Sequence, residues 1–209
     1  IGIYIMYEIT QFIVSDNKNV DSGLIIGGNK AYVSKWPINP KGKELLHLFS
    51  IDCEKVTPQI ADGILPKTGY LSIFSTYDSN DYFLDEITYF GDENELGLIK
   101  SGFTFVSYSL TGSLSKTNED FIPETKIDLL NTKINSEDYP MISFFSKDIP
   151  NGLTGVDEIL KNYHFVCQVY SADFPLPFKD VLGLSDAIGY LFIKNEGNNI
   201  EGLFFVQTA

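Results

Sequence analysis

The side chains that most often bind metals or act as nucleophiles are scarce in this sequence. It holds two histidines, His47 and His164, and two cysteines, Cys53 and Cys167. Two histidines exclude a His-rich metal site. A Cys–His pair would have to form across the fold, because His164 and Cys167 are three residues apart on a predicted strand and so point to opposite faces. We expect each histidine in the core or at a sheet edge. We also expect two reduced thiols, since the cysteines lack Cys-x-x-Cys spacing.

The common catalytic motifs are missing as well. No Gly-x-Ser-x-Gly elbow, phosphate-binding P-loop or His-Glu-x-x-His pair occurs, and Gly27-Gly28-Asn29-Lys30 is a Gly-rich turn. The sequence therefore predicts no catalytic residue, no metal site and no cofactor. Paired carboxylates leave no local motif. A carboxylate-based enzyme or a small-molecule binder therefore stays open, with Asp52 and Asp186 as candidates in a cleft between two halves of the chain.

The charge balance favours a basic protein as partner. The 209 residues include 28 acidic and 15 basic side chains, which gives a net charge of −13, and every basic residue is a lysine. The planar guanidinium of arginine suits phosphate and guanine, so an acidic chain without arginine is a poor candidate for binding nucleic acid or an anionic membrane. Such a chain attracts a basic protein instead. The alternative is that the acidity serves solubility alone.

One segment concentrates this acidity. Residues 77–99 hold seven acidic side chains and no lysine or histidine, with aromatic residues between them. Aromatic anchors supply much of the energy of an interface, while charges speed association. The alternative is a solvated strand pair without a partner, and calcium is disfavoured because Asp78-Ser79-Asn80-Asp81 lacks the order of a calcium loop. We therefore predict these partner-binding residues: Tyr77, Asp78, Asp81, Tyr82, Asp85, Glu86, Tyr89, Asp92, Glu93 and Glu95.

The hydrophobic pattern predicts a strand-rich α+β fold with antiparallel sheets and few short helices to carry these residues. The apolar side chains of residues 156–163 have helical spacing, and Thr154 stands three residues before Asp157, as in a capping box. Residues 5–13 fit a helix or a strand. Turn residues separate runs rich in β-branched and aromatic side chains, and we expect strands at 24–26, 45–51, 69–74, 102–110, 141–145, 164–170, 189–193 and 202–207.

The order of these elements favours two related halves within one domain, residues 1–209. A strand, a loop and Gly69-Tyr70-Leu71 are followed in the C-terminal part by a strand at 165–169, a loop and Gly189-Tyr190-Leu191. This pattern predicts a pseudo-duplicated strand-loop-strand unit. We place the halves at about 1–111 and 139–209, joined by a polar segment. That segment, 112–138, is expected to form loops around a short element near Ile127 to Leu130.

Several short motifs lie in a consistent order along the chain. The first half carries Gly27-Gly28, Trp36-Pro37, Gly42, Leu48-Phe49-Ser50-Ile51-Asp52, Leu65-Pro66 and the run from Gly69 to Phe74. The second half adds Gln168-Val169, the run from Asp186 to Ile193, Phe205 and Gln207. In order and spacing these motifs resemble the YwqG-like family of domains of unknown function.

The resemblance covers about residues 23–207, without a matching motif from 90 to 160. Lys30 and Ser50 stand where the family usually has Pro and Gln, and its Gly-Tyr-Pro element is not visible. The resemblance implies a mixed, strand-rich fold with an internal pseudo-repeat, and it implies no established activity.

Together these features predict a non-enzymatic bacterial interaction protein in the cytoplasm. No run of about 20 uncharged apolar residues is present, and the apolar stretch from Ile1 to Val14 contains Glu8 and lacks the basic flank of a signal peptide. The most concrete hypothesis is an immunity protein or antitoxin that masks a basic toxin domain with the acidic aromatic face. A scaffold or oligomer subunit without chemistry is a third interpretation.

Overall fold

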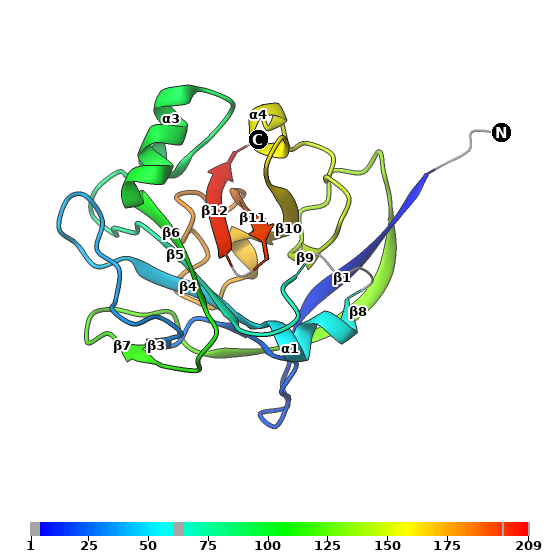
Figure 1. The fold of residues 1–209 in the computed structure, drawn as a ribbon, viewed down its shortest axis with the longest axis horizontal. Coiled ribbons are helices and arrows are strands. Elements are labelled where there is room, and N and C mark those ends of the chain that lie inside the picture. Colours follow the sequence, from blue (N-terminus) through cyan, green and yellow to red (C-terminus); the bar gives the residue numbers. More distant parts are fainter. Residues whose placement is uncertain (1–4, 61–64, 198, 209) are drawn as a thin grey trace.

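A ten-stranded antiparallel sheet curls until its two ends meet, so that it nearly closes into a barrel (Figure 1). The computed structural model describes residues 5–60, 65–197 and 199–208. The strands of the sheet are β1 (Met6–Val14), β2 (Leu24–Ile26), β4 (Leu46–Asp52), β5 (Tyr70–Ser75), β6 (Thr104–Ser109), β8 (Thr125–Asn135), β9 (Phe144–Phe145), β10 (His164–Tyr170), β11 (Ile188–Glu196) and β12 (Asn199–Gln207). Their order is β12-β11-β10-β9-β1-β8-β2-β4-β5-β6. A separate small sheet pairs β3 (Lys30–Ala31) with β7 (Ser115–Lys116).

Side-chain contacts close the barrel between β6 and β12, the two ends of the hydrogen-bonded strand order. The hydroxyl of Thr104 on β6 donates a 2.5 Å hydrogen bond to the carbonyl of Phe204 on β12. Gly202 lies so close to β6 that a side-chain carbon there would come within 2.2 Å of Val106 Cγ1. The two strands can approach this closely because glycine leaves room for the valine side chain.

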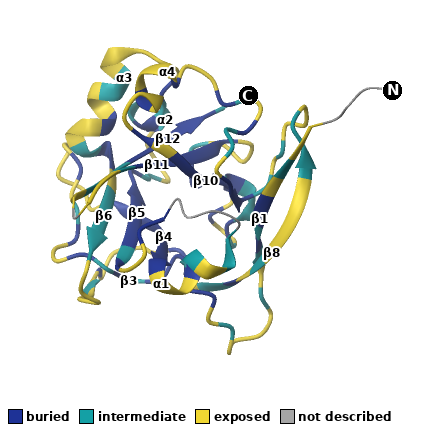
Figure 2. Cartoon of the chain, turned by 45° about the vertical axis from the view of Figure 1, so that its right-hand side comes forward, coloured by how far each residue is buried: buried dark blue, intermediate teal, exposed yellow. Residues whose placement is uncertain are grey.

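The helices are short and lie outside the barrel: α1 (Cys53–Val56), α2 (Leu84–Ile87), α3 (Glu93–Leu98) and α4 (Asp157–Leu160), with single turns at Thr57–Gln59, Ile99–Phe103 and Ser171–Asp173. The largest buried cluster contains Phe49, Leu71 and Leu191 from the strands. A second cluster joins the inner surface of α4, through Ile159, to Phe205 of β12. The strands are accordingly the most buried part of the fold (Figure 2). Among the described residues, no helix is long and apolar enough to cross a membrane.

The predicted strand-rich fold with antiparallel sheets and few short helices is confirmed. The strands expected at 24–26, 45–51, 69–74, 102–110, 164–170, 189–193 and 202–207 are β2, β4, β5, β6, β10, β11 and β12. The ambiguous stretch 5–13 is a strand, β1, as its β-branched side chains favour. The strand expected at 141–145 is limited to the two residues of β9.

Two local predictions are wrong. The polar segment 112–138 does not form loops around a short element, since residues 125–135 make up β8, which is eleven residues long. A strand with one solvated face needs few apolar side chains, and here Ile127 is buried while Asp128 and Leu130 are exposed. The helix predicted from 156 to 163 is limited to α4, and Thr154 does not cap it, because its backbone N–H and C=O bond the side chain of Gln207.

The two predicted halves share a local irregularity. The pairing of β4 with β5 shifts between His47 and Phe49, and the pairing of β10 with β11 shifts between Phe165 and Cys167. Each bulged strand continues into a short helical turn, α1 or Ser171–Asp173. When the two strand pairs are aligned on their bulges, Ile188 occupies the position of Tyr70. Ile188 pairs with Tyr170 at the end of β10, as Tyr70 pairs with Asp52 at the end of β4. The match of the two Gly-Tyr-Leu motifs is therefore out of register by two residues.

Candidate functional site: an acidic groove around Tyr77

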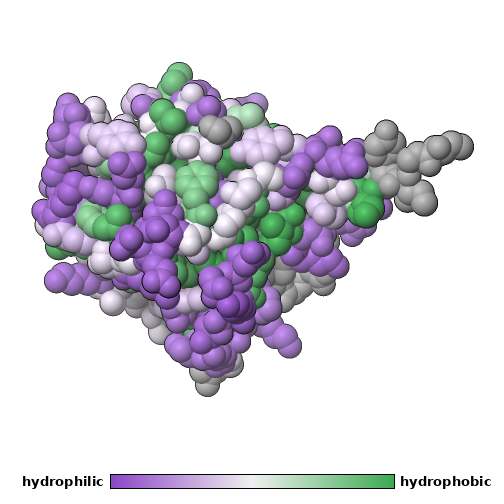
Figure 3. Space-filling view, turned by 90° about the horizontal axis from the view of Figure 1, so that it is seen from above, coloured by the Kyte–Doolittle hydropathy of each residue, from purple (hydrophilic) through white to green (hydrophobic). Residues whose placement is uncertain are grey.

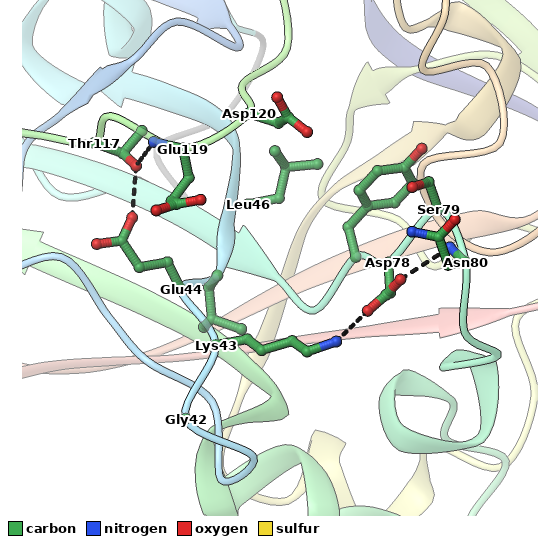
Figure 4. Close-up of a pocket in the computed structure, with 12 residues that line it drawn as sticks. Gly42, Lys43, Glu44, Leu46, Asp78, Ser79, Asn80, Thr117, Glu119 and Asp120 are labelled. Atoms are coloured by element: carbon green, nitrogen blue, oxygen red, sulfur yellow. Dashed lines mark hydrogen bonds and ion pairs between the residues drawn. The ribbon is translucent and has the colours of Figure 1, made fainter.

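Two adjacent hollows share Tyr77, Asp78 and Ser79 as a common wall. The first has a volume of about 460 Å³ and is bounded by residues 42–46, 77–80 and 117–120 (Figure 4). The second has a volume of about 250 Å³ and is bounded by residues 77–84 and by the segment from Pro177 to Gly183. We call the two hollows together the acidic groove, because the residues that line them include six carboxylates: Glu44, Asp78, Asp81, Glu119, Asp120 and Asp180.

The fold fixes Tyr77 at the centre of the groove. The preceding residue, Thr76, bonds the carbonyl of Phe103 through both its backbone N–H and its hydroxyl, each at 2.8 Å. The Tyr77 ring packs against Phe83 at 5.7 Å and Phe178 at 5.5 Å between ring centroids. These contacts anchor the ring to the two chain segments that form the second hollow, so the floor of the groove is part of the packed core.

Carboxylates from separate loops surround this ring. Burial raises the pKa of the Tyr77 hydroxyl, and the negative charges of Asp180, Asp120 and Asp78 raise that pKa further. Asp78 follows Tyr77 directly in the sequence, whereas Asp120 and Asp180 are distant in the sequence and only the fold brings them to this tyrosine. Tyr77 therefore lies close to carboxylates from three segments of the chain.

Asp78 is held in its charged form. Its carboxylate forms an ion pair with Lys43 and accepts backbone hydrogen bonds from Asn80 at 2.9 Å and Asp81 at 3.1 Å (Figure 4). The hydrogen bond from Lys43, followed by those from the two backbone N–H groups, lowers the pKa of Asp78 to about 2. Lys43 is the one lysine among the lining residues of the two hollows. Lys43 Nζ also lies 3.7 Å from Asp81 Oδ2, so one lysine faces six carboxylates and the groove stays net negative.

The other carboxylates differ in how firmly they are held. Glu44 accepts a 2.5 Å hydrogen bond from the Thr117 hydroxyl, which ties the first wall of the groove to the 117–120 segment. Asp81, Asp120 and Asp180 are exposed. The groove thus combines two carboxylates with fixed partners, Glu44 and Asp78, with a rim of exposed carboxylates.

The ten residues predicted as partner-binding divide between the groove and the helices that follow it. Tyr77, Asp78, Asp81 and Tyr82 line the groove. Asp85 accepts a 2.8 Å hydrogen bond from the Tyr82 hydroxyl at its edge. The sequence could not show that Glu44, Glu119, Asp120 and Asp180 join them, because these residues lie in other loops and carry no common motif.

The remaining predicted residues have structural partners or lie outside the groove. Glu86 forms an ion pair with Lys41. Asp92 accepts hydrogen bonds from the first turn of α3, and Glu95 completes a capping box, so this stretch is helical and not the strand pair that the alternative expected. Glu93 is exposed on α3. Tyr89 cannot contact a partner, because its side chain is 1% exposed and packs against Phe205 in the core.

The acidic groove does not converge on a metal-binding point. Among the described residues, no group of three or more His, Cys, Asp or Glu side chains is placed to hold a metal ion. The carboxylates are instead spread along the rim and walls of two hollows. Such a distribution suits an extended cationic surface better than a single small ion.

His47, Cys53 and Cys167 are buried in the core, whereas His164 is exposed at the start of β10. His47 Nε2 lies 2.8 Å from the Ser50 hydroxyl, which lies 2.7 Å from the Ser72 hydroxyl. This resembles a nucleophile with its base, but His47 and Ser50 are 1% and 4% exposed, so no substrate reaches them. Burial lowers the pKa of His47 to about 4 and raises the pKa of the Cys53 thiol to about 12. These groups are neutral core residues at neutral pH.

The carboxylates considered for an enzyme lie elsewhere. Asp52 caps α1, where its side chain accepts from the Lys55 backbone N–H at 3.4 Å and lies 3.9 Å from Lys55 Nζ. Asp186 is exposed just before β11. Neither residue lines the acidic groove, so the groove does not bring the two together.

Comparison with protein-family models and with curated proteins finds no match to this chain. The resemblance to YwqG-like domains therefore stays a prediction, and function has to be inferred from the groove itself.

Proposed function

We propose that this chain is a non-enzymatic interaction protein whose acidic groove binds a basic surface of another protein. Most concretely, it is an immunity protein or antitoxin that masks a basic toxin domain in the bacterial cytoplasm. The observation that carries the proposal is the meeting of six carboxylates from four chain segments around Tyr77, with Lys43 as the one lysine among the lining residues.

Electrostatics would give such a complex its speed and specificity. Low-dielectric walls at a hollow focus the field of charges that line it, so a net negative groove raises the local concentration of a cationic partner. Each exposed ion pair contributes at most about 1 kcal/mol, so charge alone gives modest affinity. The binding energy would come mainly from buried aromatic and aliphatic contacts.

The second hollow supplies such contacts. Tyr82 lines it and is 69% exposed, and Leu176 and Leu184, 72% and 46% exposed, adjoin the lining residues Pro177 and Gly183. Large apolar side chains this open to solvent beside a row of carboxylates fit a partner that presents lysines or arginines around an apolar anchor.

We also propose that the chain belongs to the YwqG-like family and that its halves arose by duplication of a strand-loop-strand unit. The matching bulges in β4 and β10, each followed by a short helical turn, support the duplication. The family resemblance rests on the sequence motifs alone.

Affinity capture from the native cell tests the interaction. Proteins that co-purify with the tagged chain are identified by mass spectrometry at low and at high salt, since salt screens exposed charges. We expect a stoichiometric basic partner whose recovery falls at high salt, because salt weakens the charge contacts and leaves the apolar ones. A chain that captures no basic protein at either salt concentration would count against the proposal.

Charge reversal then locates the interface. Changing Asp81, Asp120 and Asp180 to Lys replaces three attractions by repulsions and should weaken the captured complex on the order of a hundredfold. The matched control changes Asp16, Glu54 and Glu137 to Lys; these residues are also exposed, and the change in net charge is the same. Equal weakening by both triple variants would show that net charge, not the groove, drives association.

A second candidate function is the binding of a small cationic molecule in the second hollow. The observation that favours it is the origin of the lining residues in both predicted halves of the chain, with Asp81 from one half and Asp180 from the other. Thermal unfolding in the presence of small polyamines tests this candidate. A stabilisation that Asp180→Asn abolishes would support a ligand, whereas an unchanged unfolding temperature would reject it.

A further inference from the structure

The outer pair of long strands projects from the barrel. β1 and β8 pair without a break from Met6 opposite Asn135 to Val14 opposite Ile127, and their far end extends away from the body of the molecule in two views (Figures 1 and 3). β2 covers the other edge of β8 only at Thr125 and Lys126. Among the described residues, no strand pairs with this edge of β8 from residue 127 to residue 135.

The register shows which backbone groups this edge presents. Ser15 N–H donates to Lys126 O at 3.0 Å, and Ser136 N–H donates to Ile5 O at 2.9 Å. The even-numbered residues of β8 therefore direct their backbone groups toward β1, and the odd-numbered residues direct theirs away from it. The Ser22 hydroxyl bonds Ile127 O.

Three residues of this edge are left open. In the described chain, the outward backbone N–H and C=O groups of Leu129, Asn131 and Lys133 meet no hydrogen-bonding partner. These six groups form a short, regular template for another strand.

Apart from Lys133, the β8 edge lacks the features that usually protect an edge strand. The other ends of the sheet, β6 and β12, cover each other. By contrast, the β1–β8 register has no bulge, and residues 127–135 contain no proline. The edge lysine, Lys133, is 3.4 Å from Glu8 on the neighbouring strand, and Leu130 is 53% exposed on the solvent face. An unprotected edge of this kind favours strand pairing.

We infer that β8 pairs antiparallel with β8 of a second copy of this chain, about a two-fold axis at Asn131. The three open residues are symmetric about Asn131, so Asn131 faces its counterpart while Leu129 faces Lys133 on both sides of the axis. This arrangement satisfies all six open backbone groups and joins the two barrels through one continuous sheet. It is isologous, the arrangement of closed two-fold dimers.

Local charge favours a second copy over a basic partner at this edge. Lys126 and Asp128 carry opposite charges on the solvent face, and Lys133 forms an ion pair with Glu8. The charges at this edge therefore nearly cancel, and the edge does not attract a basic protein as the acidic groove does. β8 also lies on the far side of the molecule from the loop that leads into β4 (Figure 1). The dimer therefore leaves the acidic groove open, and it does not depend on the function proposed for that groove.

Sedimentation equilibrium of the full chain over a range of concentrations tests the dimer. We expect a monomer–dimer equilibrium that high salt leaves unchanged or strengthens, because both copies carry a net charge of −13 and salt screens their repulsion. Asn131→Pro removes an outward N–H from each copy, and Asn131→Lys places two like charges at the axis. Each should weaken the dimer at least about tenfold. A chain that is monomeric at every concentration, or a dimer that neither variant weakens, would overturn the inference.

Cysteine cross-linking tests the register. In the Asn131→Cys variant the two introduced cysteines would face each other across the axis with Cα atoms about 5.5 Å apart, within disulfide range. This variant should therefore form a covalent dimer on mild oxidation. Lys133→Cys is the matched control on the same edge, because its two introduced cysteines would lie about 14 Å apart. The native Cys53 and Cys167 are buried and do not compete. Equal cross-linking of both variants, or none of Asn131→Cys, would overturn the proposed pairing.

Discussion

The acidic segment 77–99 falls into two parts that have similar composition and different surroundings. In the first part, Asp78, Asp81 and Tyr82 line the acidic groove, and Asp81 and Tyr82 are exposed there. In the second part, Asp92 and Glu95 satisfy the N-terminal backbone groups of α3. The same residue types thus serve a surface in one part and a helix terminus in the other.

The difference follows from what precedes each part in the chain. The first part leaves the end of β5, where Thr76 bonds Phe103 and directs the chain around the rim of the barrel. The second part crosses the end of β12, where Tyr89 N–H bonds Val206 O and the Tyr89 ring enters the core. An acidic aromatic segment is therefore a candidate interface only where the fold leaves its aromatic residues outside.

The largest expected effect separates the two tyrosines of the segment. Tyr89→Ala removes a buried ring from the cluster around Phe205 and should lower the free energy of unfolding by about 3–5 kcal/mol. Tyr82→Ala removes an exposed ring and should change it by less than about 0.5 kcal/mol. Urea unfolding followed by fluorescence measures both changes.

Binding to the captured partner should show the reverse order. Tyr82→Ala should weaken it, whereas folded Tyr89→Ala protein should bind like the unchanged chain, because Tyr89 is absent from the surface. A Tyr89 variant that is stable but fails to bind would break the division of the segment into two parts.

A smaller effect distinguishes the groove from the core by pH. Burial lowers the pKa of His47 to about 4, while Lys43 and two backbone N–H groups lower the pKa of Asp78 to about 2. Between about pH 6.5 and pH 4 the unfolded chain binds a proton at His47 that the folded chain does not, so unfolding takes up a proton. Acidification through this window should therefore reduce stability, by about 3 kcal/mol in total.

Urea unfolding at a series of pH values measures this loss, and His47→Gln is the control because it cannot titrate. In that variant the slope of stability between pH 6.5 and pH 4 should flatten. Asp78 contributes at lower pH, since its stabilising ion pair is lost only as the pH falls below about 3.8 toward its lowered pKa. An unchanged slope in His47→Gln would place the acid sensitivity in the carboxylates.

The sequence predicted those parts of the fold in which local pattern and tertiary environment agree. β4, β5, β10 and β11 are buried on both faces and have long apolar runs. The sequence did not indicate β8 because β2 covers only the first part of this strand. The rest of β8 is largely exposed, and its residues, such as Asn131 and Lys133, have the polarity of a loop. The helix at 156–163 was overestimated because Gln207, 53 residues away from Thr154, takes the backbone groups that a cap would use.

The site was predictable only to the extent that it is local. Asp78, Asp81 and Tyr82 are close in sequence, and composition alone pointed to them. The hydrogen bond from Thr117 to Glu44 ties the segment of Asp120 to the groove, and the packing of Phe178 on Tyr77 does the same for the segment of Asp180. One sequence holds no signal for either contact. The burial of Tyr89 was also hidden, because alternation along a short irregular segment does not fix which side faces the core.

The smallest expected effect concerns the acidic residues of α3. Asp92 accepts hydrogen bonds from Asn94 N–H at 2.8 Å and Glu95 N–H at 3.3 Å. Asp92→Ala should therefore lower the free energy of unfolding by about 1 kcal/mol, as the loss of an N-cap does, and should leave partner binding unchanged. Asp81→Asn, which removes a rim charge of the groove, should do the opposite, with unchanged unfolding and weaker binding. Urea unfolding and a binding titration on both variants measure the contrast. If Asp92→Ala weakened binding as much as Asp81→Asn does, the interface would extend over α3 and the whole acidic segment would act as one surface.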